Sequence, residues 1–88
     1  MMNQSILFPD IQTWHADSQQ VNFPAQQAGA LIDCIISTEV LVRMSDRPIN
    51  SEEQAIAIFS QLRFDLEDLA EELIEDENFN AFGQIEIT

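Results

Sequence analysis

Carboxylates are the side chains in this sequence best suited to chemistry. Seven fall in residues 67–77 with no cation among them: Glu67, Asp68, Glu71, Glu72, Glu75, Asp76 and Glu77. A calcium site needs several oxygens that converge from a tight loop, usually with a glycine, and the run lacks that spacing. Acid–base catalysis needs a carboxyl group held in an apolar cleft, and no feature of the sequence places one there. The acidic run therefore predicts neither a metal site nor a catalytic site.

Two interpretations of the acidic run remain. Blocks of like charge are usually the solvated surface of an element. The functional alternative is a docking surface for a basic protein partner, and six residues would form it: Glu67, Asp68, Glu71, Glu72, Glu75 and Asp76. A weaker variant of this alternative is an acidic mimic of nucleic acid, which requires carboxylates at phosphate-like spacing on a surface.

Trp14 and Arg63 form a second candidate site. Arg63 is one of three cations, and Glu67 follows it by one helical turn. An ion pair with Glu67, or stacking over Phe64 or Trp14, would give Arg63 a structural role. The alternative is a pocket for a small ligand, or a minor enzymatic role, in which Arg63 binds an anion beside Trp14. No glycine-rich phosphate loop or nucleophile motif accompanies the two residues, so the sequence predicts no reaction.

Cys34 and His15 are each the only residue of their type. A reactive thiol needs exposure and nearby positive charge. Cys34 lies instead in an apolar run beside Asp33, so we expect it to be buried and unreactive. A zinc site needs three or four ligands, and Cys34, His15 and Asp17 are too few to propose one. We predict no cofactor and no metal, and we place His15 in a loop.

The overall charge restricts the class of partner. The chain has 16 acidic residues against three arginines, a net charge of −13 and a pI near 4.1. Nucleic-acid phosphates and anionic membranes both require clustered cations, so we expect neither as a partner. The sequence has no apolar run of about 20 residues, no signal-peptide pattern and no second cysteine. These features predict a cytoplasmic protein with a protein partner, and they leave open whether the chain is a homo-oligomer.

A long helix should carry the acidic run. Five apolar residues recur at steps of three and four, which places them on one helical face: Phe59, Leu62, Leu66, Leu69 and Leu73. Ser51 is the predicted N-cap, and Gln54 can complete a capping box. Asp65 could cap a second helix, so the pattern allows a continuous helix or one broken there. A shorter helix, capped by Ser37 or Thr38, should end near Met44.

Short strands should supply the rest of the fold. Apolar or alternating residues predict strands at 5–8, 20–23, 30–36 and 84–88, the second of them closed by Pro24. The third strand is nearly all apolar, so it should be central and buried on both faces, or else end in a buried turn. Phe79 and Phe82 should anchor the loop before the last strand. The helical stripe should pack on a fixed set of strand residues: Val21, Phe23, Leu31, Ile35, Ile85 and Ile87.

The order of these elements predicts a single α+β domain over residues 1–88. We expect a small, mainly antiparallel sheet of three to four strands with two or three helices packed on one face. The helices bury the apolar stripe against that face and leave the carboxylates outside. A small non-enzymatic interaction or regulatory module, acting through the acidic helix or a sheet edge, is the function this arrangement favours.

The order of features also resembles a bacterial family known as domain of unknown function 1488. The resemblance covers nearly the whole chain and rests on a series of short features: Phe8-Pro9, Trp14, the V-x-F of residues 21–23, Gly29, the C-x-I-S of residues 34–37, Arg63 and the C-terminal I-x-I-T. Each feature has low specificity alone, and their order carries the match. The resemblance implies a small α+β fold and no particular activity.

Overall fold

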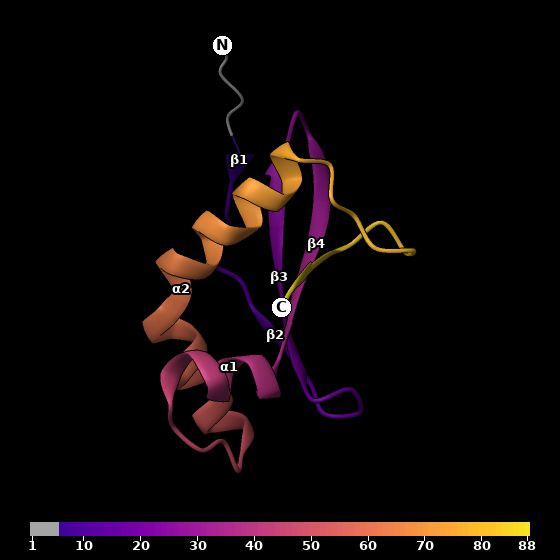
Figure 1. Cartoon of the computed structure of the whole chain (residues 1–88). Coiled ribbons are helices and arrows are strands. Elements are labelled where there is room, and N and C mark those ends of the chain that lie inside the picture. Colours follow the sequence, from indigo (N-terminus) through magenta and orange to yellow (C-terminus); the bar gives the residue numbers. More distant parts are fainter. Residues whose placement is uncertain (1–5) are drawn as a thin grey trace.

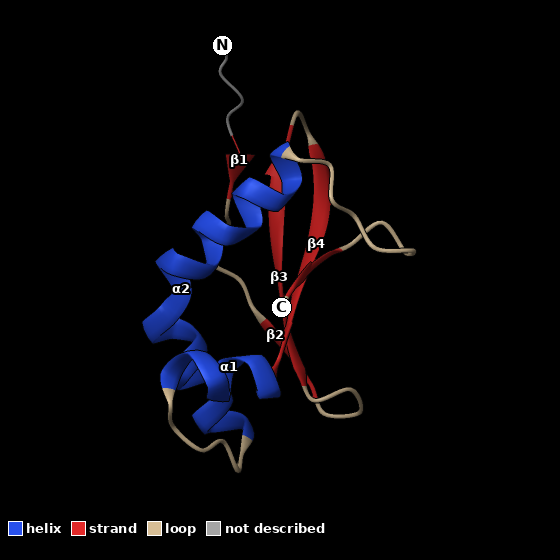
Figure 2. Cartoon of the chain, viewed as in Figure 1, coloured by secondary structure: helices blue, strands red, loops and turns tan. Residues whose placement is uncertain are grey.

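The chain folds into a five-stranded mixed sheet with both helices on one side (Figures 1 and 2). The computed structural model describes residues 6–88. The elements in chain order are β1 (Ile6–Leu7), β2 (Thr13–His15), β3 (Gln20–Gln27), β4 (Ala30–Ser37), α1 (Thr38–Ser45), α2 (Glu52–Glu75) and β5 (Ile85–Ile87). The predicted α+β class is confirmed, with five strands and two helices. Ser5, predicted to begin the first strand, lies outside the described residues.

A hairpin of β3 and β4 forms the centre of the sheet. Its antiparallel register runs from Gln20 opposite Ser37 to Gln27 opposite Ala30. The turn between the strands is closed by Ala28 and Gly29, both at positive φ. β1 and β2 pair antiparallel with opposite ends of β3. β5 instead pairs in parallel with β4, because the chain returns to the sheet through two helices rather than a tight turn.

Strand β3 continues through Pro24, although the sequence predicted that it would end there. β2 pairs with residues 20–22 and β1 with residues 26–27, so residues 23–25 have no strand partner on that side among the residues that the structure describes. Proline costs little where the ladder requires no N–H donor. The sequence also failed to predict β2, because its three residues are too few to show an alternating pattern. With β2 in place, His15 lies in a strand and not in the predicted loop.

Helix α2 is continuous through Asp65, so the unbroken alternative is confirmed. Its axis curves as it crosses the sheet (Figure 1). The predicted cap is present, since the Ser51 hydroxyl accepts the backbone N–H of Gln54 at 3.2 Å. The Gln54 side chain in turn accepts the N–H of Asn50 at 2.6 Å, one residue before the donor expected in a capping box. For α1, Ser37 and not Thr38 is the cap.

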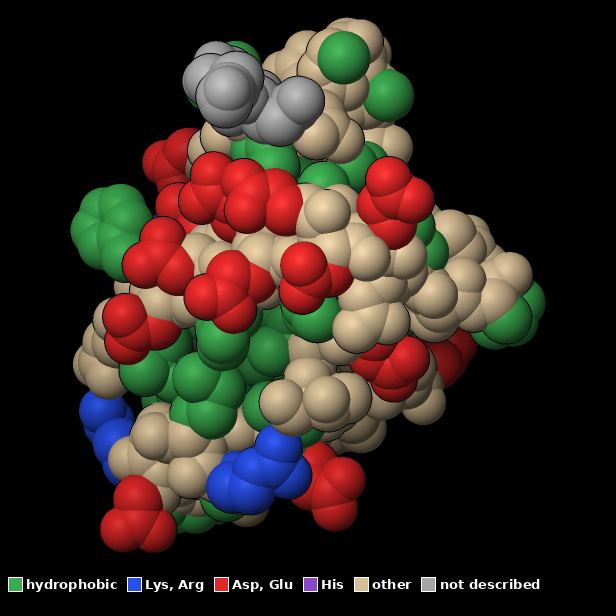
Figure 3. All heavy atoms as spheres, turned by 45° about the horizontal axis from the view of Figure 1, so that its top comes forward, with side chains coloured by type: hydrophobic (Ala, Val, Ile, Leu, Met, Phe, Trp, Pro, Cys, Tyr) green, Lys and Arg blue, Asp and Glu red, His purple; other side chains and the backbone are tan. Residues whose placement is uncertain are grey.

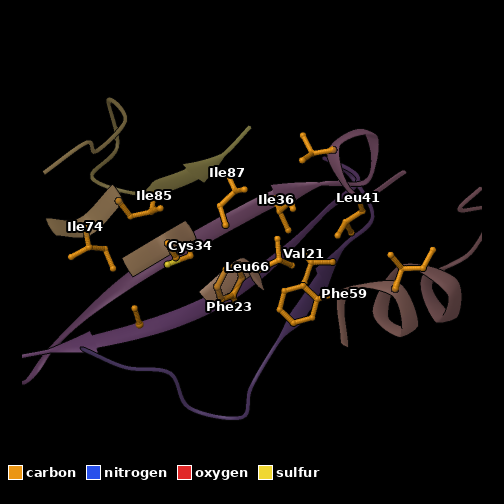
Figure 4. Packing of buried hydrophobic residues seen from close by; sticks show 14 residues of the cluster. Val21, Phe23, Cys34, Ile36, Leu41, Phe59, Leu66, Ile74, Ile85 and Ile87 are labelled. Carbon is orange, nitrogen blue, oxygen red and sulfur yellow. The ribbon is translucent and has the colours of Figure 1, made fainter. Parts of the chain in front are cut away.

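The hydrophobic core fills the space between the helices and one face of the sheet (Figure 4). The rings of Phe23 and Phe59 lie 5.2 Å apart at its centre. Leu66 is fully buried, whereas Leu62 and Leu73 are only partly so. Leu69 is 38% exposed, and its predicted burial is wrong because it lies on the flank of the stripe.

Three further predictions of burial are wrong. Leu31 is 71% exposed because it lies opposite Gln26 and so points to the face of the sheet that no helix covers. Phe79 and Phe82 are 41% and 86% exposed and do not anchor their loop. Asn80 holds that loop instead, because its side-chain oxygen accepts the backbone N–H groups of Phe82 and Gln84, each at 2.9 Å.

Candidate functional site

The acidic surface of α2 is the first candidate site, and the structure leaves most of its carboxylates in solvent. Asp68, Glu72, Glu75 and Asp76 are exposed, and Glu71 is half-buried. None of these five forms an ion pair within the described residues. Because successive residues of a helix point in different directions, the side chains diverge and do not converge on one point. Across residues 6–88 no group of three or more potential ligands could hold a metal ion.

Glu67, the sixth predicted member of the surface, is turned away from it. Its carboxylate accepts the Nε–H of Arg63 at 3.0 Å, and the two side chains are 18% and 14% exposed. The predicted ion pair between Arg63 and Glu67 is therefore present. We call the five remaining carboxylates, Asp68, Glu71, Glu72, Glu75 and Asp76, the acidic surface.

An aromatic side chain stands within this acidic helix face. Phe64 is 81% exposed, with Asp68 one turn and Glu71 two turns farther along the same side of α2. From the sequence we expected Phe64 only as a stacking partner for Arg63. Its position five residues after Phe59 places it about 140° around the helix from the core, a signal that was available in the sequence. Single exposed apolar residues are common, but an exposed aromatic ring next to a row of carboxylates resembles an interface anchor with a charged neighbourhood.

The space-filling view shows how charge and apolar surface are distributed on this side of the molecule. Carboxylates form rows across the upper part of the face, an apolar strip lies directly below them, and arginine side chains lie farther down (Figure 3). Leu69 and Met44 are apolar side chains of α2 and α1 that are 38% and 37% exposed. The acidic rows therefore border apolar area that a partner could cover.

Arg63, the second candidate, is occupied by contacts within the chain. Nη1 donates to the Gln12 side-chain oxygen at 2.7 Å, and Nη2 donates to the Pro9 carbonyl at 2.8 Å. The guanidinium also lies over the Phe59 ring, 5.4 Å from its centroid. These contacts fasten the segment before β2 to α2. They match the predicted structural role, although the stacking partner is Phe59 and not Phe64 or Trp14.

Trp14 lies in a different place from Arg63. It is half-buried on β2, opposite Val21, and lines a hollow of about 270 Å³. The other lining residues come from the β2–β3 turn and the start of α2: Ala16, Gln19, Ile49, Asn50, Ser51 and Glu52. Arg63 does not line this hollow. An anion bound there would meet Glu52 and no arginine, so the hollow lacks the positive charge on which the predicted ligand pocket depended.

Cys34 is buried in β4, as predicted. Burial, followed by the negative charge of Asp33, raises the pKa of the Cys34 thiol from 9.0 to about 12. Thiolate is the reactive form, so a raised pKa makes the side chain a poor nucleophile. His15 is exposed, pairs with Gln20 across the β2–β3 ladder, and points to the uncovered face of the sheet, whereas Cys34 faces the core. Neither residue builds a site with the other.

Comparison with known proteins places the chain in a family. A sequence profile described as "Protein of unknown function (DUF1488)" matches residues 6–87. The chain belongs to the DUF1488 family. It is 42% identical over 86 residues to "Uncharacterized protein YrdB" of Escherichia coli (strain K12), with 96% of each chain covered. The protein of the same name from Shigella flexneri is 40% identical over the same length.

A crystal structure of a DUF1488 protein from Shewanella loihica PV-4 has the same fold. It matches with a TM-score of 0.94 at 45% identity, and the match covers 99% of this chain and 96% of that one. Its description, like those of the relatives, assigns no activity. Within the described part of the chain no helix is both long and apolar enough to cross a bilayer. The question of function therefore returns to the surfaces of this molecule.

Proposed function

We propose that the chain is a small protein-binding module that docks a basic partner through the acidic surface of α2. The observation that carries this proposal is the exposed Phe64 ring beside carboxylates that form no ion pair within residues 6–88. Interfaces commonly place an aromatic anchor at the centre and charged residues at the rim. Here the ring would fill an apolar pocket of the partner while the carboxylates meet its lysines and arginines.

The net charge supports a basic partner in particular. With 16 acidic residues and three arginines, the chain carries a field that attracts cations from about one Debye length, ~8 Å at physiological salt. Such a field raises the association rate for a basic protein and repels a second copy of the chain. Two of the three arginines, Arg43 and Arg47, are exposed, but they lie on α1 and the loop after it and not among the α2 carboxylates.

Capture from a bacterial lysate at low and high salt tests the proposal. The wild-type chain should recover a basic protein at low salt and release it at high salt. Phe64→Ser should fold normally, because the ring is 81% exposed, and should lose that protein. Phe82→Ser is the matched control, since Phe82 is 86% exposed but lies in the loop before β5. Equal recovery by the Phe64 and Phe82 variants would contradict the proposal.

A ligand pocket that combines Trp14 with Arg63 has less support. The three nitrogens of Arg63 already donate to Glu67, Gln12 and Pro9, so an anion would have to displace contacts that hold the chain together. Trp14 is the only tryptophan, so its fluorescence reports directly on the hollow that it lines. A saturable change in that fluorescence on titration with a small anion would favour the pocket over the docking surface.

A further inference from the structure

Strand β5 has one bare edge. The sheet order β1-β3-β4-β5 gives β5 a single neighbour, β4, among residues 6–88. The parallel register places Glu86 opposite Ile35, with Ile85 and Ile87 opposite Cys34 and Ile36. On its other side β5 presents backbone N–H and C=O groups that pair with no strand in the described part of the chain. β5 contains no lysine or proline, and its guards against pairing are its short length and the charge of Glu86.

Two hollows meet at this bare edge. The first measures about 220 Å³ and is lined by the end of α2, the loop after it and β5: Leu73, Asn78, Phe79, Asn80, Glu86 and Thr88. The second measures about 250 Å³, lies toward α1 with Val40 and Arg43 in its wall, and also contains Glu86 and Thr88. Both hollows share Glu86 and Thr88, so a strand added beside β5 would find space for its side chains at both ends of that edge.

The lining of the hollows defines the side chains that would fit. Leu73 is partly buried and Phe79 is 41% exposed, so the first hollow offers apolar surface that a partner side chain could cover. Glu86 is exposed, points to the same side of the sheet as Ile35, and forms no ion pair in the part of the chain that is described. Opposite charges placed across neighbouring strands attract, so a basic residue is the complement of Glu86.

We infer that the bare edge of β5 accepts an extended segment of a partner protein, with apolar side chains toward Leu73 and Phe79 and a basic side chain toward Glu86. The strand has three residues, which limits main-chain pairing to about two or three hydrogen bonds. The hollows therefore have to contribute the rest of the affinity and the specificity. This edge is a different surface from the α2 carboxylates, and binding there does not depend on them.

A second copy of this chain is a poorer occupant of the edge. Pairing of two β5 strands would bring two negatively charged Glu86 side chains together and join two chains of net charge −13. Like charges directly opposite one another across a ladder are destabilising. A basic segment gains from the same charges that a second copy would have to overcome.

A designed peptide tests the inference. The probe is a fluorescent nonapeptide of alternating valine and arginine with both ends blocked, and binding is measured by anisotropy at physiological salt. A block peptide of the same composition, with all valines first, keeps the charge but loses the alternation. A third peptide carries N-methyl groups on alternate amides along one edge, which removes donors without changing side chains. We expect the alternating peptide to bind about tenfold more tightly than either control.

Two charge reversals then locate the site. Glu86→Lys should lower the affinity for the valine–arginine peptide about fivefold. It should raise the affinity for a valine–glutamate peptide by a similar factor. Glu53→Lys makes the same charge change at the start of α2, outside the acidic surface, and should alter either affinity less than about twofold. Phe79→Ala should weaken both peptides without changing their ranking. Amide protection measured by hydrogen exchange should increase at residues 85–87 when the peptide is added.

The following outcomes would overturn the inference. Absence of binding, or equal binding of the alternating and block peptides, would show that β5 does not pair with an added strand. Loss of binding on Glu72→Lys but not on Glu86→Lys would place the peptide on the acidic surface, which leaves the proposed function standing while this inference fails. A dimer in sedimentation that Glu86→Lys strengthens or abolishes would show that a second copy occupies the edge.

Discussion

Replacement of Arg63 by lysine tests the contact that fastens the N-terminal segment to α2. The guanidinium reaches three acceptors with separate nitrogens, Glu67 at 3.0 Å, Gln12 at 2.7 Å and Pro9 at 2.8 Å. A lysine has one nitrogen and cannot reproduce that planar fork. We expect the lysine to keep the hydrogen bond to the nearest acceptor and to lose the hydrogen bonds to the other two.

The size of the effect depends on those two lost bonds. Hydrogen bonds to a charged donor contribute about 1.5 kcal/mol or more each, and the Pro9 carbonyl and Gln12 amide recover part of this from water because both are only half-buried. We expect Arg63→Lys to lower the free energy of unfolding by about 2 kcal/mol, which for a chain of this length lowers Tm by about 10 °C. Amide protection should fall at β1 and β2 before it falls at β4.

Thermal unfolding with Arg47→Lys as the control measures the effect. Arg47 is exposed and donates one hydrogen bond, to the Gln61 side chain at 2.8 Å, so its replacement should cost less than about 0.5 kcal/mol. Equal changes for the two variants, or unchanged protection at β1 and β2, would refute the conclusion that Arg63 fastens the segment.

Three further predictions concern the core, the thiol and a helix cap. Leu66→Ala should lower the free energy of unfolding by about 3 kcal/mol in chemical denaturation, because the loss of a fully buried side chain leaves a cavity. Leu69→Ala should lower it by only about 1 kcal/mol, because that side chain is 38% exposed, and equal losses would contradict the orientation of α2. Cys34 should resist a thiol reagent in the native state and react on unfolding, and rapid labelling of the folded chain would contradict its burial. Because the pKa of the Cys34 thiol is raised to about 12 in the folded chain, the stability that the thiol contributes should be fully present below pH 9 and should be lost as the pH rises from 9 toward 12. Ser51→Ala should cost about 1 kcal/mol through the lost hydrogen bond to the Gln54 N–H, and no measurable cost would show that the cap contributes nothing.

Local signals made α2 predictable from the sequence. The three-and-four spacing located its buried face, and a serine followed three residues later by glutamine located its start. Burial of the strand residues was harder to predict, because alternation separates two faces of a strand but does not show which face meets the core until the register is known. Leu31 was assigned to the core on composition, yet its pairing with Gln26 turns it to the uncovered face.

Contacts between distant segments could not be predicted from local pattern. Arg63 binds the backbone of Pro9, 54 positions earlier, and that contact depends on how β1, β2 and α2 assemble. The parallel pairing of β5, which creates the bare edge, likewise depends on the path of the chain through both helices. The exposure of Phe64, in contrast, could be predicted from the sequence. Its spacing from Phe59 along the helix already points its side chain away from the core.

The most direct test of the proposed function is neutralisation of the acidic surface without a change in its shape. A variant with Glu71→Gln, Glu72→Gln and Glu75→Gln should fold as the wild type does, and association with the captured partner, measured by surface plasmon resonance across a salt series, tests the surface. We predict that the association rate falls at least about tenfold at low salt and loses most of its salt dependence. An association rate and salt dependence equal to those of the wild type would contradict the claim that the acidic surface docks a basic partner.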